Sequence, residues 1–356
     1  MTAEESLLRA DRILNLTVSP LMMLLSLIGN ILAFLIFWRS SFSTMPMSVY
    51  LRFLAIMDAG TVVTGLLPRF LLAVTDYDIR GRNEVSCQFQ VYAVYVFTEL
   101  SAWTLVIVTS ERVMSIIRPH RVKILCTKIK SYVILSVVSV IIMLANSPIF
   151  VFFGKQAVTE STAELYREQH SDVLSTNSSS LETTNTSGSI FRPCGFRDTI
   201  SQSGKTWFLT HFVKQSLLPF ILILTLNSII ILALIRRRSA LLKSCAKEFN
   251  SPLANKDIAK RPTEGVYAPM MSRKDASLSV TLVAINIVFL MCNFPIGIYQ
   301  QIVFNLPDRY ENSDQSLVYS VLVFCLYLNN TLNFILYSTT GSRFRKELRN
   351  MFLCSS

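Results

Sequence analysis

The stretch ILNLTVSPLMMLLSLIGNILAFLIFW, residues 13–38, carries no charged side chain. About 20 consecutive apolar residues are enough to cross the hydrocarbon core of a bilayer as a helix, so this stretch predicts a membrane span. Residues 131–154, 276–307 and 315–342 are equally free of charge. With a mean hydropathy of +0.44 and only 16% charged residues, the chain is too apolar for an ordinary soluble domain.

Three further apolar stretches each contain isolated ionisable residues. Residues 53–68 hold Asp58, residues 85–110 hold Glu99, and residues 206–235 hold His211 and Lys214. The total is seven spans, expected at about 15–38, 48–75, 84–117, 129–153, 206–235, 276–304 and 315–339. Because the runs are long and continuous, a transmembrane β-barrel is excluded. We expect an all-α membrane protein, a seven-transmembrane helix bundle in a single domain over residues 1–356.

The segments between the spans differ in charge. Basic residues gather after the first, third, fifth and seventh spans, whereas the intervening segments are mixed or acidic. The positive-inside rule therefore predicts an extracellular N-terminus and a cytoplasmic C-terminus. This scatter of basic residues over cytoplasmic segments also argues against nucleic acid as the partner, despite a net charge of +11. We expect a multi-pass protein of the plasma membrane.

Cysteines and glycosylation sequons agree with this orientation. Only Cys87 and Cys194, of seven cysteines, fall in segments assigned to the outside, where disulfides persist. We expect these two to pair, the alternative being two free thiols. Sequons in the outer segments predict glycosylation at Asn15, Asn177 and Asn185.

The C-terminal segment predicts a further helix that does not cross the membrane. Over about residues 341–352, Phe344 and later apolar residues alternate with Arg and Lys, which is typical of a basic amphipathic helix on the cytoplasmic membrane surface. Cys354 follows at a position suited to palmitoylation. The alternative is an unmodified thiol.

Polar residues in the spans suggest an ion site. A charge near the bilayer centre is costly and is a functional hypothesis by default, and Asp58 is the clearest case. Ser101, Asn329 and Asn333 are expected at the same depth. These oxygen ligands suit a hard cation, in practice Na⁺. The alternative is a water-filled polar network.

The chain shows no pattern typical of an enzyme. It has no Gly-rich phosphate loop, no metal-ligand cluster and no nucleophile with an evident base. Beyond the sodium ion we expect no cofactor. Glu111 and Arg112 end the third span, where an acid beside a base is either functional or an interfacial anchor.

The order and spacing of several motifs resemble the rhodopsin-like G-protein-coupled receptors. These motifs are Gly29-Asn30 in the first span, Leu54-Ala55-Ile56-Met57-Asp58 in the second, Glu111-Arg112-Val113 ending the third, Pro219 in the fifth, Phe289 and Cys292-Asn293-Phe294-Pro295 in the sixth, and Asn333-Phe334-Ile335-Leu336-Tyr337 followed by Phe344 in and after the seventh. The resemblance covers nearly the whole chain and implies a receptor that activates heterotrimeric G proteins.

The resemblance also implies roles for particular residues. Arg112 would be held by Glu111 at rest and would contact the G protein in the active state. The four polar residues around Asp58 match the sodium pocket of the family. An activation relay would run through the last two helices, and its expected members are Phe289, Pro295, Asn333 and Tyr337.

Four departures from the family pattern predict a modified relay. Asn293 replaces the usual Trp of the sixth helix, Phe334 replaces the usual Pro of the seventh, and Asn227 replaces the usual Tyr of the fifth. The fourth span lacks its usual Trp. A Tyr–water–Tyr latch to Tyr337 therefore cannot form, and Phe289 is the remaining switch candidate.

The ligand is expected to be a short neuropeptide. Val94 stands where amine receptors carry an Asp, and residues 116–127 resemble those of invertebrate neuropeptide receptors of the FMRFamide and thyrotropin-releasing-hormone type. The expected ligand-binding residues are Arg69, Tyr95, Thr98, Glu99, His211, Tyr299, Gln300 and Tyr327. Glu99 has two interpretations: a structural bridge to Lys214, or a contact with a basic ligand group such as the Arg of an Arg-Phe-amide peptide.

Two other classes of function stay open from the sequence. A seven-span channel or transporter is one, although no paired repeat is visible. A non-signalling scaffold of receptor ancestry is the other, because of the four departures.

Overall fold

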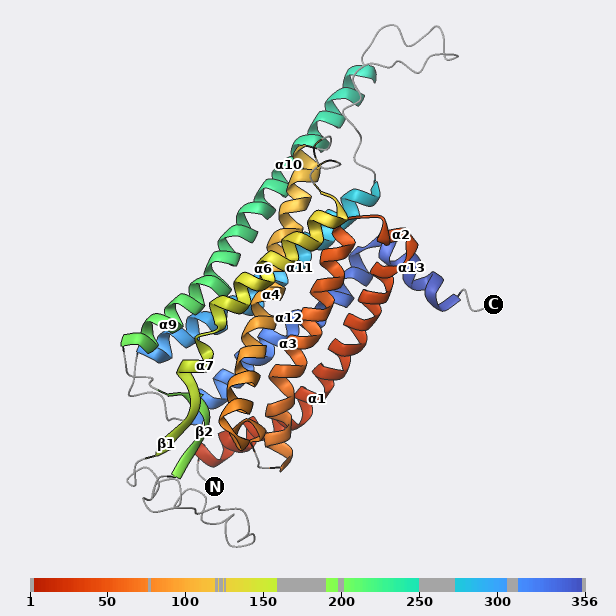
Figure 1. The fold of residues 1–356 in the computed structure, drawn as a ribbon. Coiled ribbons are helices and arrows are strands. Elements are labelled where there is room, and N and C mark those ends of the chain that lie inside the picture. The colour runs from red at the N-terminus through yellow and green to blue at the C-terminus, as the bar shows by residue number, and fades with distance from the viewer. Residues whose placement is uncertain are drawn as a thin grey trace, which may run out of the picture.

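The computed structural model describes residues 3–75, 78–118, 121, 124, 126–158, 190–197, 202–249, 273–305 and 313–353. Within these residues, seven helices are long and apolar enough to cross a membrane, as the sequence predicts. They lie side by side in one elongated bundle (Figure 1). The N-terminal end and a two-stranded sheet lie at one end of the bundle, and the C-terminal helix lies toward the other.

The first four spans are built from long helices with short connections. α1 is Ala3–Trp38, α3 is Met47–Thr75, α4 is Glu84–Ile117 and α6 is Lys128–Asn146. Short helices α2 (Ser40–Ser43), η1 (Ile79–Arg82) and α7 (Ile149–Phe152) join or extend them. The fourth span is interrupted where α6 ends before Pro148, which has no backbone N–H to continue the helix.

The last three spans complete the bundle. The fifth consists of α9 (Gln202–Phe212), the π-helical turn η2 (Val213–Leu217) and α10 (Leu218–Phe249). The sixth and seventh are α11 (Arg273–Asn305) and α12 (Ser313–Thr340). α12 is one unbroken helix, in keeping with Phe334 in place of the usual Pro.

The distribution of side chains is that of a membrane protein. Large apolar side chains such as Ile134 and Leu224 are exposed, whereas Asp58, Asn286 and Asn333 are buried. Lipid replaces water on the outside of the bundle, so polar groups gain most by facing one another inside it.

The predicted amphipathic helix is α13 (Ser342–Leu353). Its Phe344 is buried and packs against Tyr337 of α12 and Phe37 of α1, with ring centroids 5.4 and 5.5 Å apart. These contacts attach α13 to the end of the bundle.

The predicted disulfide is confirmed. Cys87 and Cys194 are bonded, with Cα atoms 5.3 Å apart and a sequence separation of 107 residues. Cys194 lies on β2 (Ile190–Phe196), which pairs antiparallel with β1 (Phe153–Val158). The disulfide thus holds a hairpin, which the sequence analysis did not anticipate, against the start of α4.

Of the four predicted modification sites, the structure describes only Asn15. Asn177, Asn185 and Cys354 lie outside the described residues. Asn15 lies inside α1, which begins at Ala3 rather than near residue 15, and its buried amide donates to the Asp11 carbonyl at 2.9 Å. A glycan is bulky and needs a surface position, so this setting does not favour glycosylation of Asn15, which stays a prediction.

Candidate functional site

A cavity opens between five spans near the hairpin end of the bundle. Its volume is about 110 Å³, and one wall residue, Tyr95, packs against Phe153 of β1 with ring centroids 6.2 Å apart. Six of the eight residues expected to bind ligand line this cavity. They are Arg69, Tyr95, Thr98, His211, Gln300 and Tyr327.

The other two expected residues lie next to the cavity wall. Tyr299 packs against Tyr319, which lines the cavity, with ring centroids 6.2 Å apart. Glu99 lies behind the wall, bound to His211. The cavity also has lining residues that the sequence analysis did not single out, including Gln215, Ser216 and Gly297.

A close approach of two helices shapes the cavity floor. Any side chain at Gly65 of α3 would overlap the hydroxyl of Tyr327 of α12. Glycine at this position therefore lets the two helices approach and fixes the Tyr327 ring at the cavity.

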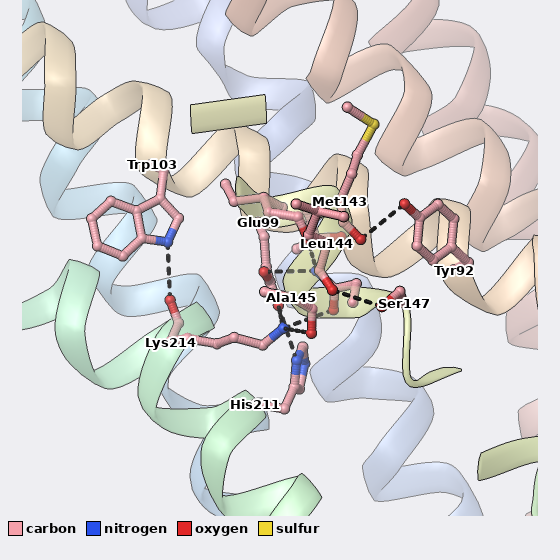
Figure 2. Close-up of polar contacts among 12 residues, drawn as sticks. Tyr92, Glu99, Trp103, Met143, Leu144, Ala145, Ser147, His211 and Lys214 are labelled. Carbon is pink, nitrogen blue, oxygen red and sulfur yellow. Dashed lines mark hydrogen bonds and ion pairs between the residues drawn. The ribbon is translucent and has the colours of Figure 1, made fainter. Parts of the chain in front are cut away.

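Glu99 is the centre of a buried ionic cluster (Figure 2). Its Oε1 lies 3.0 Å from Lys214 Nζ and 3.1 Å from His211 Nδ1. Only 1% of the Glu99 side chain is exposed, so its charge needs partners. The cluster therefore links α4 to α9 and η2, and it supports the structural interpretation of Glu99.

Asn146 completes this cluster from the fourth span. Its Nδ2 donates to Glu99 Oε2 at 2.9 Å, and its Oδ1 accepts from Lys214 Nζ at 2.8 Å. Glu99 Oε2 is thus hydrogen-bonded, whereas Oε1 is in ion-pair contact with Lys214 and His211 and accepts no hydrogen bond from a described residue. The signal that could have identified Asn146 is an amide inside an otherwise apolar span.

A local irregularity in the fifth span positions Lys214. Across η2 the backbone bonds run from residue i to i+5, as from Leu218 N–H to the Val213 carbonyl. The next bond of this kind would need an N–H at Pro219, which has none. The Lys214 carbonyl instead accepts from Trp103 Nε1 at 3.1 Å, so the indole stabilises the turn that carries the lysine (Figure 2).

Two of the predicted sodium ligands hold Asp58 at the middle of the bundle. Ser101 Oγ donates to Asp58 Oδ1 at 2.5 Å, and Asn333 Nδ2 donates to Asp58 Oδ2 at 2.6 Å. Asn329 makes a different contact, since its Nδ2 donates to Asn330 Oδ1 at 2.9 Å. All four predicted residues are buried.

These residues fit a sodium ion. Among the described residues, the buried Oδ1 atoms of Asn329 and Asn333 receive no hydrogen bond. A buried acceptor without a donor is costly, and a hard cation prefers such oxygens together with a carboxylate. An ion held by Asp58, Ser101, Asn329 and Asn333 would supply a positive charge opposite the Asp58 carboxylate.

Arg112 is buried at the opposite end of α4 from the disulfide. Only 7% of it is exposed, and one guanidinium nitrogen contacts the Met47 sulfur of α3. Glu111 lies close enough for the two charges to attract. In this conformation the guanidinium is folded against the bundle.

The expected relay residues occupy different environments. Phe289, Asn333 and Tyr337 are buried, and Tyr337 lies against Phe37 with ring centroids 5.1 Å apart. Pro295 lies inside α11 on its exposed face. Tyr337 is therefore packed among aromatic rings rather than directed at the fifth span.

Asn227 takes part in a polar bridge that the sequence analysis missed. Asn286 Nδ2 of α11 lies 2.9 Å from Asn227 Oδ1 of α10 and 2.9 Å from Thr109 Oγ1 of α4. All three side chains are buried. The bridge joins three spans in the half of the bundle that contains Arg112.

Comparison with known proteins identifies the family. The sequence pattern described as 7 transmembrane receptor (rhodopsin family) matches residues 29–337. The chain belongs to the rhodopsin family of seven-transmembrane receptors. Members of this family respond to a ligand, couple to G proteins and are generally not enzymes. The family and the seven apolar helices together imply a multi-pass protein of the plasma membrane.

A curated relative matches a smaller part of this receptor. Human Olfactory receptor 56B2 is 31% identical to it over 101 residues, which is 28% of this chain and 31% of the relative. The match therefore spans about a third of the length of that relative.

Proposed function

We propose that this receptor binds a short peptide at the hairpin end of the bundle and activates heterotrimeric G proteins at the opposite end. The observation that carries the proposal is the arrangement along α4. This helix contributes Tyr95 and Thr98 to the cavity, Ser101 to the Asp58 centre and Arg112 to the opposite end. One rigid element thus connects a ligand cavity to the residue that would contact the G protein.

The charge pattern and the disulfide support an extracellular hairpin end. The Cys87–Cys194 disulfide lies there, and disulfides persist in oxidising surroundings. The N-terminus is then outside, as the positive-inside rule predicts.

The size of the cavity limits how much of a peptide can enter it. Ligand pockets commonly measure about 300–1,000 Å³, whereas this one measures about 110 Å³. A peptide would place one end in the cavity and lay the remainder against the hairpin. The resemblance of residues 116–127 to neuropeptide receptors agrees with this.

Ligand-dependent nucleotide exchange tests the proposal. Purified receptor in lipid nanodiscs would be mixed with purified heterotrimers of each G-protein class and a library of short peptides. We expect one or more peptides to accelerate GDP release. If the protein were a channel or a non-signalling scaffold, GDP release would not accelerate for any combination of peptide and heterotrimer. That result would contradict the proposal.

A further inference from the structure

Arg69 is a cation in the cavity wall that makes no ion pair with any carboxylate among the described residues. It lies in the membrane-spanning part of α3 and lines the cavity. Within the part of the chain that the structure describes, its contacts are Ser320 Oγ at 3.3 Å and the face of the Tyr319 ring, 5.1 Å from the guanidinium carbon. Ionisable residues inside membrane spans are costly and typically mark a binding partner or a pathway.

The other charges near the cavity compensate one another. His211 and Lys214 both lie within ion-pair distance of Glu99, and Asn146 occupies the second carboxylate oxygen. Glu99 therefore already has cationic partners within the chain: Oε2 is hydrogen-bonded by Asn146, and Oε1 is in ion-pair contact with Lys214 and His211. Among the described residues that line the cavity, the charge left without an opposite charge is that of Arg69.

The cavity also presents a hydrogen-bond acceptor across from α3. Gln215 of η2 lines the cavity, and its buried Oε1 receives no hydrogen bond from any described residue. A ligand N–H would satisfy this oxygen. The remaining wall is largely aromatic and aliphatic, with Val94, Ile296 and Leu326 among its members.

We propose that the ligand of this receptor carries a carboxylate, which enters the cavity and binds the Arg69 guanidinium. The planar fork of a guanidinium matches the two oxygens of a carboxylate. This inference rests on the proposed function insofar as the cavity is the ligand site. It replaces the hypothesis of a basic ligand group on Glu99.

A binding assay without G protein tests the inference directly. Short peptides ending in an apolar residue would be prepared in two forms, with a free C-terminal carboxylate and with a C-terminal amide. Small apolar carboxylic acids and their primary amides form a second pair. Binding to purified receptor would be measured by thermal stabilisation across a concentration series.

We expect the carboxylate forms to bind and the matched amides to bind at least about tenfold more weakly, as for the loss of one charged hydrogen-bonded pair. Arg69→Gln should lower affinity for the carboxylates by a similar factor and leave the weak binding of amides unchanged. Arg69→Lys should retain part of the preference, because it keeps the charge and loses the fork.

Arg80→Gln is the matched control. Arg80 pairs with Asp78 at 2.8 Å and does not line the cavity, so its loss should change no affinity. Each variant is compared with wild type for its melting temperature without probe, which separates lost binding from lost folding.

The two arms distinguish the source of the carboxylate. Binding of peptide acids that weakens in Gln215→Leu indicates a peptide C-terminus, since a peptide N–H would use the Gln215 oxygen. Binding of small acids that is unchanged in Gln215→Leu indicates a small-molecule acid.

Three results would overturn the inference: equal binding of acids and amides, unchanged acid binding in Arg69→Gln, or no binding of any carboxylate probe to wild type. None of them depends on nucleotide exchange. Failure of signalling alone, with Arg69-dependent binding of acids, would count against the proposed function and not against this inference.

Discussion

At the scale of single residues, Asp58 and Glu99, the two buried carboxylates among the described residues, differ in the kind of partner that each has. Glu99 has both oxygens bound by a lysine, a histidine and an amide. Asp58 accepts from Ser101 and Asn333, and the buried amide oxygens of Asn329 and Asn333 have no donor among the described residues. The first arrangement already contains the cation Lys214, whereas the second leaves amide oxygens that a cation could bind.

Lys214→Met should destabilise the folded receptor. Removing one partner of a buried ion pair leaves an uncompensated charge and typically costs about 3–5 kcal/mol; we expect the lower end, because 21% of the Lys214 side chain is exposed. The melting temperature of the purified protein should fall by several degrees. The control Arg80→Gln removes one partner of a partly exposed pair with Asp78, outside the fully buried interior, and should shift the melting temperature less. Equal shifts of the melting temperature in Lys214→Met and Arg80→Gln would show that the Glu99 cluster does not stabilise the fold.

Asp58→Asn should abolish the response of the receptor to sodium. An ion that binds the resting state better shifts the equilibrium away from the active state. Basal nucleotide exchange by wild-type receptor is therefore expected to fall when Na⁺ replaces K⁺ at constant ionic strength. The same exchange measured with Asp58→Asn should not respond. An identical Na⁺ response in both proteins would mean that the Asp58 centre is a polar network without an ion.

The sequence predicted part of these residue environments. The depth of Asp58, Ser101 and Asn333 could be read from their positions in the spans, since each apolar run has a middle. The second contact of Lys214, with Asn146, could not, because it depends on how the fourth helix is rotated about its axis, and apolar side chains surround that helix on every face.

At the scale of helices, the Asn286 bridge replaces a contact that this sequence cannot make. With Asn227 in place of a tyrosine, the fifth span has no phenol to offer Tyr337. Its amide oxygen instead accepts from Asn286 of α11, which also bonds Thr109 of α4. We infer that this bridge holds α11 against α4 and α10 at rest.

Asn286→Leu should raise basal nucleotide exchange by about tenfold. Two buried hydrogen bonds contribute about 1–3 kcal/mol together, and a shift of that size in the resting equilibrium corresponds to roughly 5–150-fold. Asn227→Leu should also raise basal exchange. The free-energy effect of the double variant should be smaller than the sum of the two single effects, because both substitutions remove the same hydrogen bond between Asn286 and Asn227.

Ser228→Ala serves as the control for this bridge. Ser228 neighbours Asn227, but its hydroxyl donates within its own helix, to the Leu224 carbonyl at 2.8 Å. It should leave basal exchange unchanged. Basal exchange that is equal in Asn286→Leu and Ser228→Ala would show that the bridge does not restrain α11.

The number of spans followed from the sequence, whereas the irregularities within the helices did not. Continuous apolar runs fix how many spans there are. The π-helical turn Val213–Leu217 depends on Trp103 of another helix as well as on Pro219. A contact between two helices cannot be predicted from the sequence of either helix alone.

At the scale of the whole molecule, three observations agree on one fold: the seven spans, the disulfide and the family match. The described helices form one bundle (Figure 1), and the family pattern extends from the first span to the seventh. The cavity at one end and Arg112 at the other are joined by α4. The central claim is that a change at one end of this bundle is transmitted to a G protein at the other.

Basal GDP release from purified heterotrimers tests this claim without knowledge of the ligand. It would be measured with wild-type receptor, with Asn286→Leu, and with Asn286→Leu combined with Arg112→Ala, at matched receptor concentration in nanodiscs. We expect Asn286→Leu to accelerate release from at least one class of heterotrimer and Arg112→Ala to abolish that acceleration. Release that no receptor variant accelerates, or that Asn286→Leu accelerates equally with and without Arg112, would contradict the account.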